Sequence, residues 1–382
     1  MKKLNFIIKC GLALLLLSFY SCESWLNVTP SDRLSEEMLF NDREGFVKAL
    51  NGVYIELNTN ELYGRNLTAG ALDVMGQYYS VASSSHAFYN YGGLVYTGND
   101  EKALFDNMWQ KCYAVIACCN TIIEKCDENK AGLSPVWKGS IKGEALALRA
   151  MLHFDMLRLF GPLTSELDKE SIPYQTNSDQ TVTPLLSGSE VIGLILDDLK
   201  NAVGLLKDTD PYFVEEEFSD TDLNYRRFRM NYFAAKGLMA RVQLWGGDKE
   251  KAAATAKEVI AEGQAEGAEF FPFVTNSEAT SSNPDRVFYS EVLFGTYHSS
   301  REKLHEDLFA PTLESTSILT LAGTARRDDL YDNENDYRYS VWSTYNKNGT
   351  SVLYHRKFEK QDNVTASRQY MIPLIRMSEM YL

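Results

Sequence analysis

Apolar residues recur at the spacing of an α-helix in several separate stretches of the chain, and the strongest of these is 137–160. There, apolar side chains fall on nearly every face of the predicted helix, which is typical of a helix buried between neighbouring elements. Asp155 and Arg158 lie three residues apart within it and can pair. Gly161 and Pro162 follow, and they end the helix because proline cannot continue the hydrogen-bond ladder. We therefore expect the rest of the fold to pack around this helix.

A second strong helical signal covers 231–263, where two amphipathic stretches flank a Gly-Gly-Asp turn. Small residues such as Ala235 and Ala252 on the facing sides let the two helices approach, which is how tetratricopeptide hairpins pack. One hairpin cannot bury its own apolar face, so further helices must stack on it. The expected pairs are 107–126 with 136–160, and 191–206 with 231–245.

Two helix starts can be read from capping residues. Ser187 and Glu190 form a capping box before the apolar stripe at 191–206. Asn41 and Glu44 are placed in the same way before a stripe that continues to Leu57. Both patterns predict helices whose first turn is closed by a side chain.

The other stretches show no helical period. Residues 67–100 are rich in tyrosine, phenylalanine, glycine and serine, which predicts a long aromatic loop of the kind that is often functional. The charged run at 207–229 is predicted to be a solvated excursion, and 264–370 is irregular except for a short strand at 287–294. We therefore predict a mainly α fold, with tetratricopeptide-like helical hairpins in one lobe and a loop-rich, weakly β second lobe.

The N-terminus has the pattern of an export signal over residues 1–21. Lys2 and Lys3 precede a short apolar run that is well below the roughly 20 residues needed to span a membrane. Cys22 follows the small residue Ser21, as in a bacterial lipoprotein, which predicts that Cys22 carries a lipid anchor. The alternative is an ordinary secretory signal with an incidental cysteine.

Three further cysteines, Cys112, Cys119 and Cys126, share one face of the 104–126 helix. They lie about 10 Å apart along it, too far to form a disulfide, so we interpret them as small core residues. His153, on the strongest helix, is likewise interpreted as a hydrogen-bonded core histidine. We therefore expect neither a disulfide framework nor a metal cluster here.

Composition and motifs limit the possible functions of this chain of 382 residues. A net charge of −14 argues against nucleic acid as a partner. The 22 tyrosines and 19 phenylalanines fit either a surface that stacks on ligands or an aromatic core. Phosphate-loop, dinucleotide and serine-hydrolase motifs are missing, and His305-Glu306 lacks the second histidine of a zinc protease because Phe309 stands there. We therefore expect no enzyme, no cofactor and no metal.

The segment EALALRAMLHFDMLRLFGPL at 144–163 resembles the helix motif of the SusD/RagB family, outer-membrane lipoproteins that capture nutrients in Bacteroidetes. The segment after Cys22, the stretch DNMWQKCYAVIACCNTII and the pair Asp198-Leu199 resemble the same family. This resemblance implies a SusD-like domain over 22–382, with loop insertions at 67–100 and 264–370. The tail QYMIPLIRMSEMYL resembles the start of the family's last conserved helix, so we expect an apolar helix there and a domain that is incomplete at its C-terminus.

The resemblance also implies a function. The chain is expected to be a lipid-anchored outer-membrane protein, facing the cell surface, that binds an oligosaccharide and delivers it to a SusC-like TonB-dependent transporter. Two alternatives stay open: a RagB-like protein that binds peptides, and a helical-repeat scaffold that binds only protein.

The predicted binding site lies where the 67–100 loop meets the later irregular segments. Flat aromatic rings can stack on sugar faces, which makes the exposed tyrosines of these loops the candidates. The stacking candidates are Tyr79, Tyr89, Tyr91 and Tyr96, with Asn90 as a polar partner and Tyr297, Trp342 and Tyr345 from the second lobe. The alternative is that these rings only fix long loops to the helices.

Overall fold

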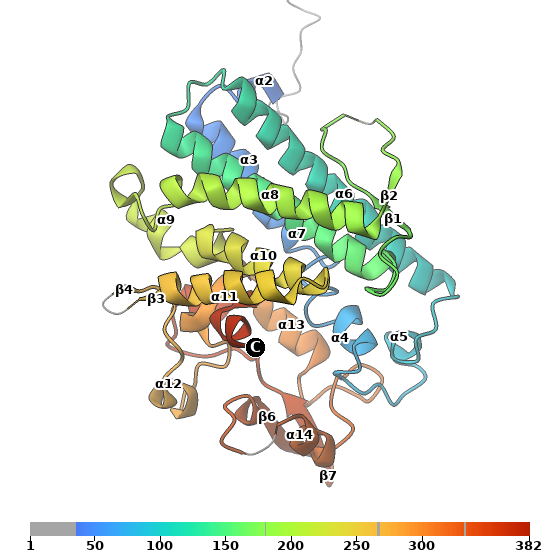
Figure 1. Ribbon diagram of the computed structural model, residues 1–382. Coiled ribbons are helices and arrows are strands. Elements are labelled where there is room, and N and C mark those ends of the chain that lie inside the picture. The colour runs from blue at the N-terminus through green and yellow to red at the C-terminus, as the bar shows by residue number, and fades with distance from the viewer. Residues whose placement is uncertain (1–35, 180, 266–267, 332–333) are drawn as a thin grey trace, which may run out of the picture.

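The computed structural model describes residues 36–382, apart from 180, 266–267 and 332–333 (Figure 1). The predicted export signal and Cys22 lie outside the described residues. Six long helices form the first lobe and lie side by side in Figure 1. They are α3 (Arg43–Leu57), α6 (Asn99–Glu128), α7 (Pro135–Phe160), α8 (Gly188–Thr209), α10 (Tyr232–Trp245) and α11 (Lys249–Gly263).

The helix α7 is the centre of this lobe, as its apolar pattern predicted. It contacts α3, α6, α8 and α10, and the helices α10 and α11 form the predicted hairpin. The helices α7 and α8 approach closely at Gly143, where an added Cβ would lie 2.7 Å from Cγ of Leu206. The predicted pairs α6–α7 and α8–α10 are confirmed, and α8 also packs along α7, which joins the pairs into one stack. The prediction of a mainly α fold built from helical hairpins is therefore confirmed.

Capping and core predictions are confirmed with one correction. The capping box of Ser187 and Glu190 is present at α8. Helix α3 is capped by Asp42 rather than by Asn41, because the Asp42 carboxylate accepts a hydrogen bond from the Gly45 N–H at 2.8 Å. Asp155 and Arg158 form the expected ion pair.

The interpretation of the core cysteines and of His153 is also confirmed. Cys112, Cys119 and Cys126 are buried and unbridged. His153 Nδ1 lies 2.9 Å from the Arg149 carbonyl oxygen, and its Nε2 accepts from the Gln175 N–H at 3.0 Å. Burial lowers the pKa of His153 to about 3, so the ring is a neutral core group.

The stretch 207–229, predicted to be solvated, instead inserts an arginine into the core. The Arg226 side chain is 2% exposed and makes ion pairs with Asp210 and Glu144. Tyr54 of α3 donates to the same Glu144 carboxylate at 2.7 Å. A buried charge needs such partners, and here they link α3, α7 and the end of α8. Asp210, Arg226 and Phe228 of this segment are therefore buried, although its charged sequence predicted a solvated segment.

The second lobe is made of short elements and small two-stranded antiparallel sheets, as the weakly β prediction states. The tail was predicted to begin a helix, but Leu374 and Ile375 belong to a strand, β8 (Met371–Arg376), that pairs with β5 (Val292–Tyr297). This sheet lies on α10, because an added Cβ at Gly237 would be 3.1 Å from Leu293 of β5. Residues 371–376 of the apolar tail are thus covered by pairing with a distant strand, and a helical turn follows only after them, in the 3-10 helix η6 (Met377–Tyr381).

The remaining described elements are short and connect these frameworks. In the N-terminal half they are α2 (Glu36–Leu39), α4 (Ala71–Met75), α5 (Tyr89–Gly92), β1 (Glu170–Pro173), β2 (Leu185–Ser187), η2 (Glu215–Glu217), α9 (Asp220–Asn224) and η3 (Arg226–Phe228). In the C-terminal half they are β3 (Gln264–Ala265), β4 (Ala268–Glu269), α12 (Asn276–Thr280), η4 (Tyr289–Glu291), α13 (Arg301–Leu308), α14 (Thr324–Leu330), η5 (Tyr339–Val341), β6 (Trp342–Lys347), β7 (Thr350–His355), α15 (Ala366–Tyr370) and η6 (Met377–Tyr381).

Two main hydrophobic cores result, and Phe228, Val292 and Met371 form a third, small cluster. The larger core fills the helical stack, and the smaller one joins residues 69–91 to residues 304–372. Residues 67–100 therefore do meet the later irregular segments, but they do so through buried rings and two short helices, α4 and α5. Among the described residues, none of the helices has both the length and the apolarity needed to cross a membrane.

Candidate functional site

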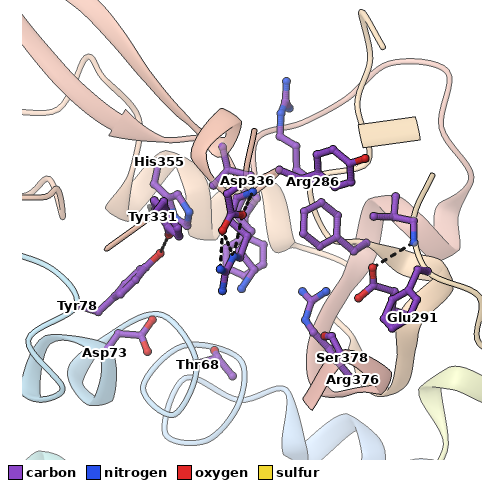
Figure 2. A pocket seen from close by; sticks show the side chains of 18 of the residues that line it. Thr68, Asp73, Tyr78, Arg286, Glu291, Tyr331, Asp336, His355, Arg376 and Ser378 are labelled. Atoms are coloured by element: carbon purple, nitrogen blue, oxygen red, sulfur yellow. Dashed lines mark hydrogen bonds and ion pairs between the residues drawn. The ribbon is translucent and has the colours of Figure 1, made fainter. Parts of the chain in front are cut away.

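A cavity of about 770 Å³ lies where the loop around α4 meets the second lobe (Figure 2). Its volume falls within the range of roughly 300–1,000 Å³ that is typical of sites for small ligands. Side chains from five separate parts of the chain point into it, as Figure 2 shows. These parts are 68–79, 273–291, 331–341, 355–358 and 376–382.

Aromatic side chains form part of the wall. The hydroxyl groups of Tyr78 and Tyr331 lie 2.7 Å apart, so one donates to the other (Figure 2). Burial, reinforced by the neighbouring Tyr331, raises the pKa of Tyr78 well above its ordinary value, so this phenol stays neutral. A neutral hydroxyl pair beside ring faces offers both donors and acceptors to a polar ligand.

The backbone holds Phe288 at the cavity in an unusual conformation. Phe288 has a positive φ of 51°, which is uncommon for a bulky residue and costs roughly 1–3 kcal/mol. The Asp285 carboxylate accepts hydrogen bonds from the N–H groups of Val287 and Phe288, both at 3.0 Å, and from Tyr289 at 2.8 Å. This turn fixes the ring of Phe288 in the wall, 6.4 Å from the ring of Tyr337.

Charged side chains complete the wall, and some of them are already satisfied by the protein. Asp336 pairs with Arg338 at 2.6 Å, and Glu291 accepts from the Val274 N–H at 3.1 Å (Figure 2). Asp73 lines the cavity without a side-chain hydrogen bond from the described residues, and burial raises its pKa to about 6.

Three cations of the wall carry lowered pKa values. Burial, together with the nearby Arg376, lowers the pKa of Lys357 to about 8. Burial also lowers the pKa values of Arg376 and Arg286. Each of these groups would therefore be stabilised by an additional negative charge in the cavity.

The structure corrects three of the predicted stacking residues. Tyr79, Tyr91 and Trp342 are only 5%, 3% and 4% exposed, and all three belong to the smaller core. Trp342 stacks on His355 with ring centroids 4.5 Å apart, and the Tyr79 hydroxyl lies 3.2 Å from Nδ1 of His355. Because neighbouring side chains cover their faces, these rings fix the loop to the second lobe, which is the alternative stated above.

The other five predicted residues lie outside the cavity. Tyr89 and Tyr345 are 43% and 42% exposed. Tyr96 and Tyr297 are half-buried against Phe105 and Phe228 respectively, and the Asn90 amide donates to Glu101 at 2.8 Å. Of the eight residues predicted, Tyr79 is the one that also lines the cavity. Tyr89 and Tyr345 are exposed aromatic rings, but neither of them lines the cavity.

The sequence reasoning missed most of the cavity wall. Tyr78 is adjacent to a predicted residue, whereas Phe288 lies in a segment predicted to be a short strand, Tyr331 in one predicted to be irregular and Arg376 in one predicted to be a helix. Only one feature of the sequence could have marked Arg376 as a candidate: it is the single charged residue in the apolar run MIPLIRM. Across the described part of the chain, no group of three or more histidine, cysteine or acidic side chains is arranged to hold a metal.

Comparisons with known proteins show which proteins this chain is similar to. The family model SusD-like_3, described as "Starch-binding associating with outer membrane", matches residues 24–244, more than half of the chain. SusD-like protein P2 of Formosa agariphila is 26% identical over 265 residues, covering 68% of this chain and 46% of that protein. A SusD-like protein of Bacteroides ovatus is 30% identical over 146 residues, covering 37% of this chain and 23% of that protein. The chain thus spans less than half the length of these curated relatives.

Solved structures share the fold. A SusD superfamily protein from Bacteroides thetaiotaomicron matches with a TM-score of 0.68 at 21% identity, covering 89% of this chain and 74% of that one. A protein from Bacteroides vulgatus described as a putative sugar binding protein matches with a TM-score of 0.68 at 23% identity, covering 89% of this chain and 72% of that one. The helical stack, the loop-rich second lobe and the match over 24–244 lead to one conclusion: this chain belongs to the SusD-like family.

Proposed function

We propose that this protein is a lipid-anchored outer-membrane protein that binds a glycan in the cavity beside α4 and passes it to a SusC-like TonB-dependent transporter. Membership of a family described as starch-binding and associated with the outer membrane supports the ligand class and the location. The export signal followed by Cys22 supports the anchor, whereas the proposed location at the cell surface rests on the family resemblance alone.

The observation that carries the proposal is the composition of the cavity wall. Sugar rings present apolar C–H faces that pack on aromatic rings, while their hydroxyl groups need donors and acceptors at the edges. Phe288 and Tyr337 supply ring surface, and the hydroxyl pair of Tyr78 and Tyr331 supplies both kinds of hydrogen-bonding group. A concave site of this kind suits an oligosaccharide segment better than it suits the broad contact surface of a protein scaffold.

Titration of glycans into the full-length lipoprotein in detergent micelles tests the proposal. Isothermal calorimetry with a library of oligosaccharides would identify a ligand, and the variants Phe288→Ala and Tyr331→Phe would locate it. Loss of one stacking ring or one hydrogen bond removes about 1 kcal/mol, so each variant should weaken binding roughly fivefold to tenfold.

Tyr345→Ala is the matched control, because it removes an exposed ring outside the cavity. It should leave the affinity unchanged. If Tyr345→Ala weakens binding while Phe288→Ala does not, the ligand sits on the exposed loops and the cavity assignment is wrong. If peptides bind and no glycan does, the ligand is a peptide and the proposed ligand class is wrong.

A further inference from the structure

The cavity carries more positive charge than its own carboxylates neutralise, and this concerns the identity of the proposed glycan. Arg376 is the clearest case. Its Nη1 atom is buried without a hydrogen-bond partner, and no carboxylate of the described residues lies within ion-pair distance of its guanidinium. The ring of Phe288 lies beside it, with its centroid 5.6 Å from the guanidinium carbon. A guanidinium group that is removed from water normally pairs with a carboxylate, phosphate or sulfate.

Two further cations on the wall are incompletely satisfied. Lys357 forms no ion pair with the described residues, and its ammonium nitrogen lies 5.1 Å from the ring centroid of Phe358. Arg286 has an unpartnered buried Nε, and it shares its one carboxylate, Glu359, with Arg356. Of the three cations Arg376, Lys357 and Arg286, only Arg286 has a carboxylate partner among the described residues, and it shares that partner, Glu359, with Arg356.

The carboxylates near the cavity offset this charge only in part. Asp336 is already paired with Arg338. Glu291 and Asp285 attract Arg376 electrostatically, but neither forms an ion pair with it, and Glu291 accepts a hydrogen bond from the Val274 N–H group. Asp73 attracts Lys357 electrostatically but forms no ion pair with Lys357 or Arg376. Arg376 and Arg286 both line the cavity, and the ring of Phe288 lies beside Arg376, so this part of the wall offers cationic groups to a ligand (Figure 2). Lowered pKa values at Lys357, Arg286 and Arg376 agree with this geometry.

We infer that the ligand is an acidic oligosaccharide, carrying a carboxylate or sulfate group that Arg376 binds with help from Arg286 and Lys357. This inference rests on the proposed glycan-binding function and narrows its substrate class. The aromatic wall holds the sugar face, and the cations hold the acidic substituent. A planar guanidinium can bind either a carboxylate or a sulfate through two parallel hydrogen bonds. The site therefore requires a negatively charged group on the glycan but does not specify which of the two acids it is.

The test compares matched pairs of glycans on the full-length lipoprotein. Uronic-acid oligosaccharides are titrated beside the same chains with their carboxylates reduced to hydroxymethyl groups, and sulfated oligosaccharides beside their desulfated forms. At least one acidic member should bind about tenfold or more tightly than its neutral counterpart, because a hydrogen bond to a charged group is stronger than a neutral one. Which pair responds distinguishes the carboxylate from the sulfate.

Variants locate the effect. Arg376→Gln should weaken binding of the acidic glycan by about 10- to 100-fold and leave any binding of its neutral counterpart unchanged. Lys303→Gln is the matched control, since it removes the same charge from an exposed site on α13 outside the cavity, and it should have no effect. Without ligand, Arg376→Gln should melt no lower than the wild type, because no ion pair is lost; a purely structural arginine would show the reverse.

The outcomes separate the two proposals. If neutral and acidic glycans bind equally, or if Arg376→Gln binds acidic glycans normally, this inference is overturned and glycan binding in the cavity stands. If no glycan binds, the proposed function itself fails. If a glutamate-rich peptide binds and competes for the cavity, the cations recognise a peptide and both proposals are wrong.

Discussion

Replacing Arg226 by methionine should destabilise the fold strongly, because this side chain holds two buried carboxylates. Its Nε and Nη2 atoms donate to the two oxygens of Asp210 at 3.0 and 2.6 Å, and its Nη1 donates to Glu144. The side chains of Asp210 and Glu144 are 0% and 4% exposed. Removing one partner of such a buried network costs about 3–5 kcal/mol, since it leaves charge in the core without compensation.

The remaining partners set the size of the effect. Glu144 keeps Arg229 at 3.0 Å and the Tyr54 hydroxyl, so its charge is still paired. Asp210 keeps only backbone donors, the N–H groups of Tyr212 at 3.0 Å and Tyr232 at 2.8 Å, and no cation. The loss should therefore come mainly from Asp210. The double variant Arg226→Met/Asp210→Asn should recover part of it, because the uncompensated charge is gone.

Thermal unfolding followed by circular dichroism measures this loss. With an unfolding entropy of about 2.1 cal/mol/K per residue, 3–5 kcal/mol corresponds to a fall in Tm of about 4–7 °C for a domain of this size. Arg338→Met is the control, since its ion pair with Asp336 is largely exposed and should matter by less than about 1 kcal/mol. An Arg226→Met protein as stable as the Arg338→Met protein would refute the reasoning that 207–229 contributes to the core.

Three other predictions follow from the same structure. Gly143→Val should destabilise the protein by about 1–3 kcal/mol in urea unfolding, because the added Cβ would clash with Leu206 where α7 meets α8. Gly193→Ala has open space around it and should stabilise α8 by up to about 1 kcal/mol. Equal effects of the two variants would contradict this packing. Affinity for an acidic glycan should fall as pH rises from 5 to 9, first as Asp73 ionises around its pKa of about 6 and then as Lys357 loses its proton around its pKa of about 8. Lys357→Gln should abolish the upper step, and persistence of that step would exclude Lys357. Cys22→Ala should move the protein from the membrane fraction to the soluble fraction. Unchanged fractionation would show that the prediction of a lipid anchor on Cys22 is wrong.

The sequence predicted those parts of the fold that depend on local periodicity. The helix α7, the α10–α11 hairpin and the capping box of α8 are each encoded within one continuous stretch. The tail could not be predicted in this way. Leu374 and Ile375 are as apolar as a buried helix requires, and only their pairing with β5, far away in the sequence, makes them a strand.

The candidate site was predicted only in its general location. Loop 67–100 does meet the later irregular segments, but sequence cannot distinguish a tyrosine that stacks on a ligand from one that is packed in a core. Tyr79 and Trp342 are packed, whereas Tyr89 and Tyr345 are exposed. Arg376, the residue on which the acidic-ligand inference depends, has no motif around it, since its role depends on neighbours from distant parts of the chain.

The central claim is that the cavity beside α4 binds the glycan, and a structure of the full-length lipoprotein with its bound oligosaccharide tests it most directly. We expect a sugar ring against Phe288, a hydroxyl group hydrogen-bonded to Tyr78 or Tyr331, and an acidic group within about 3 Å of the Arg376 guanidinium. A glycan bound instead on the exposed rings of Tyr89 or Tyr345, with the cavity empty, would contradict it.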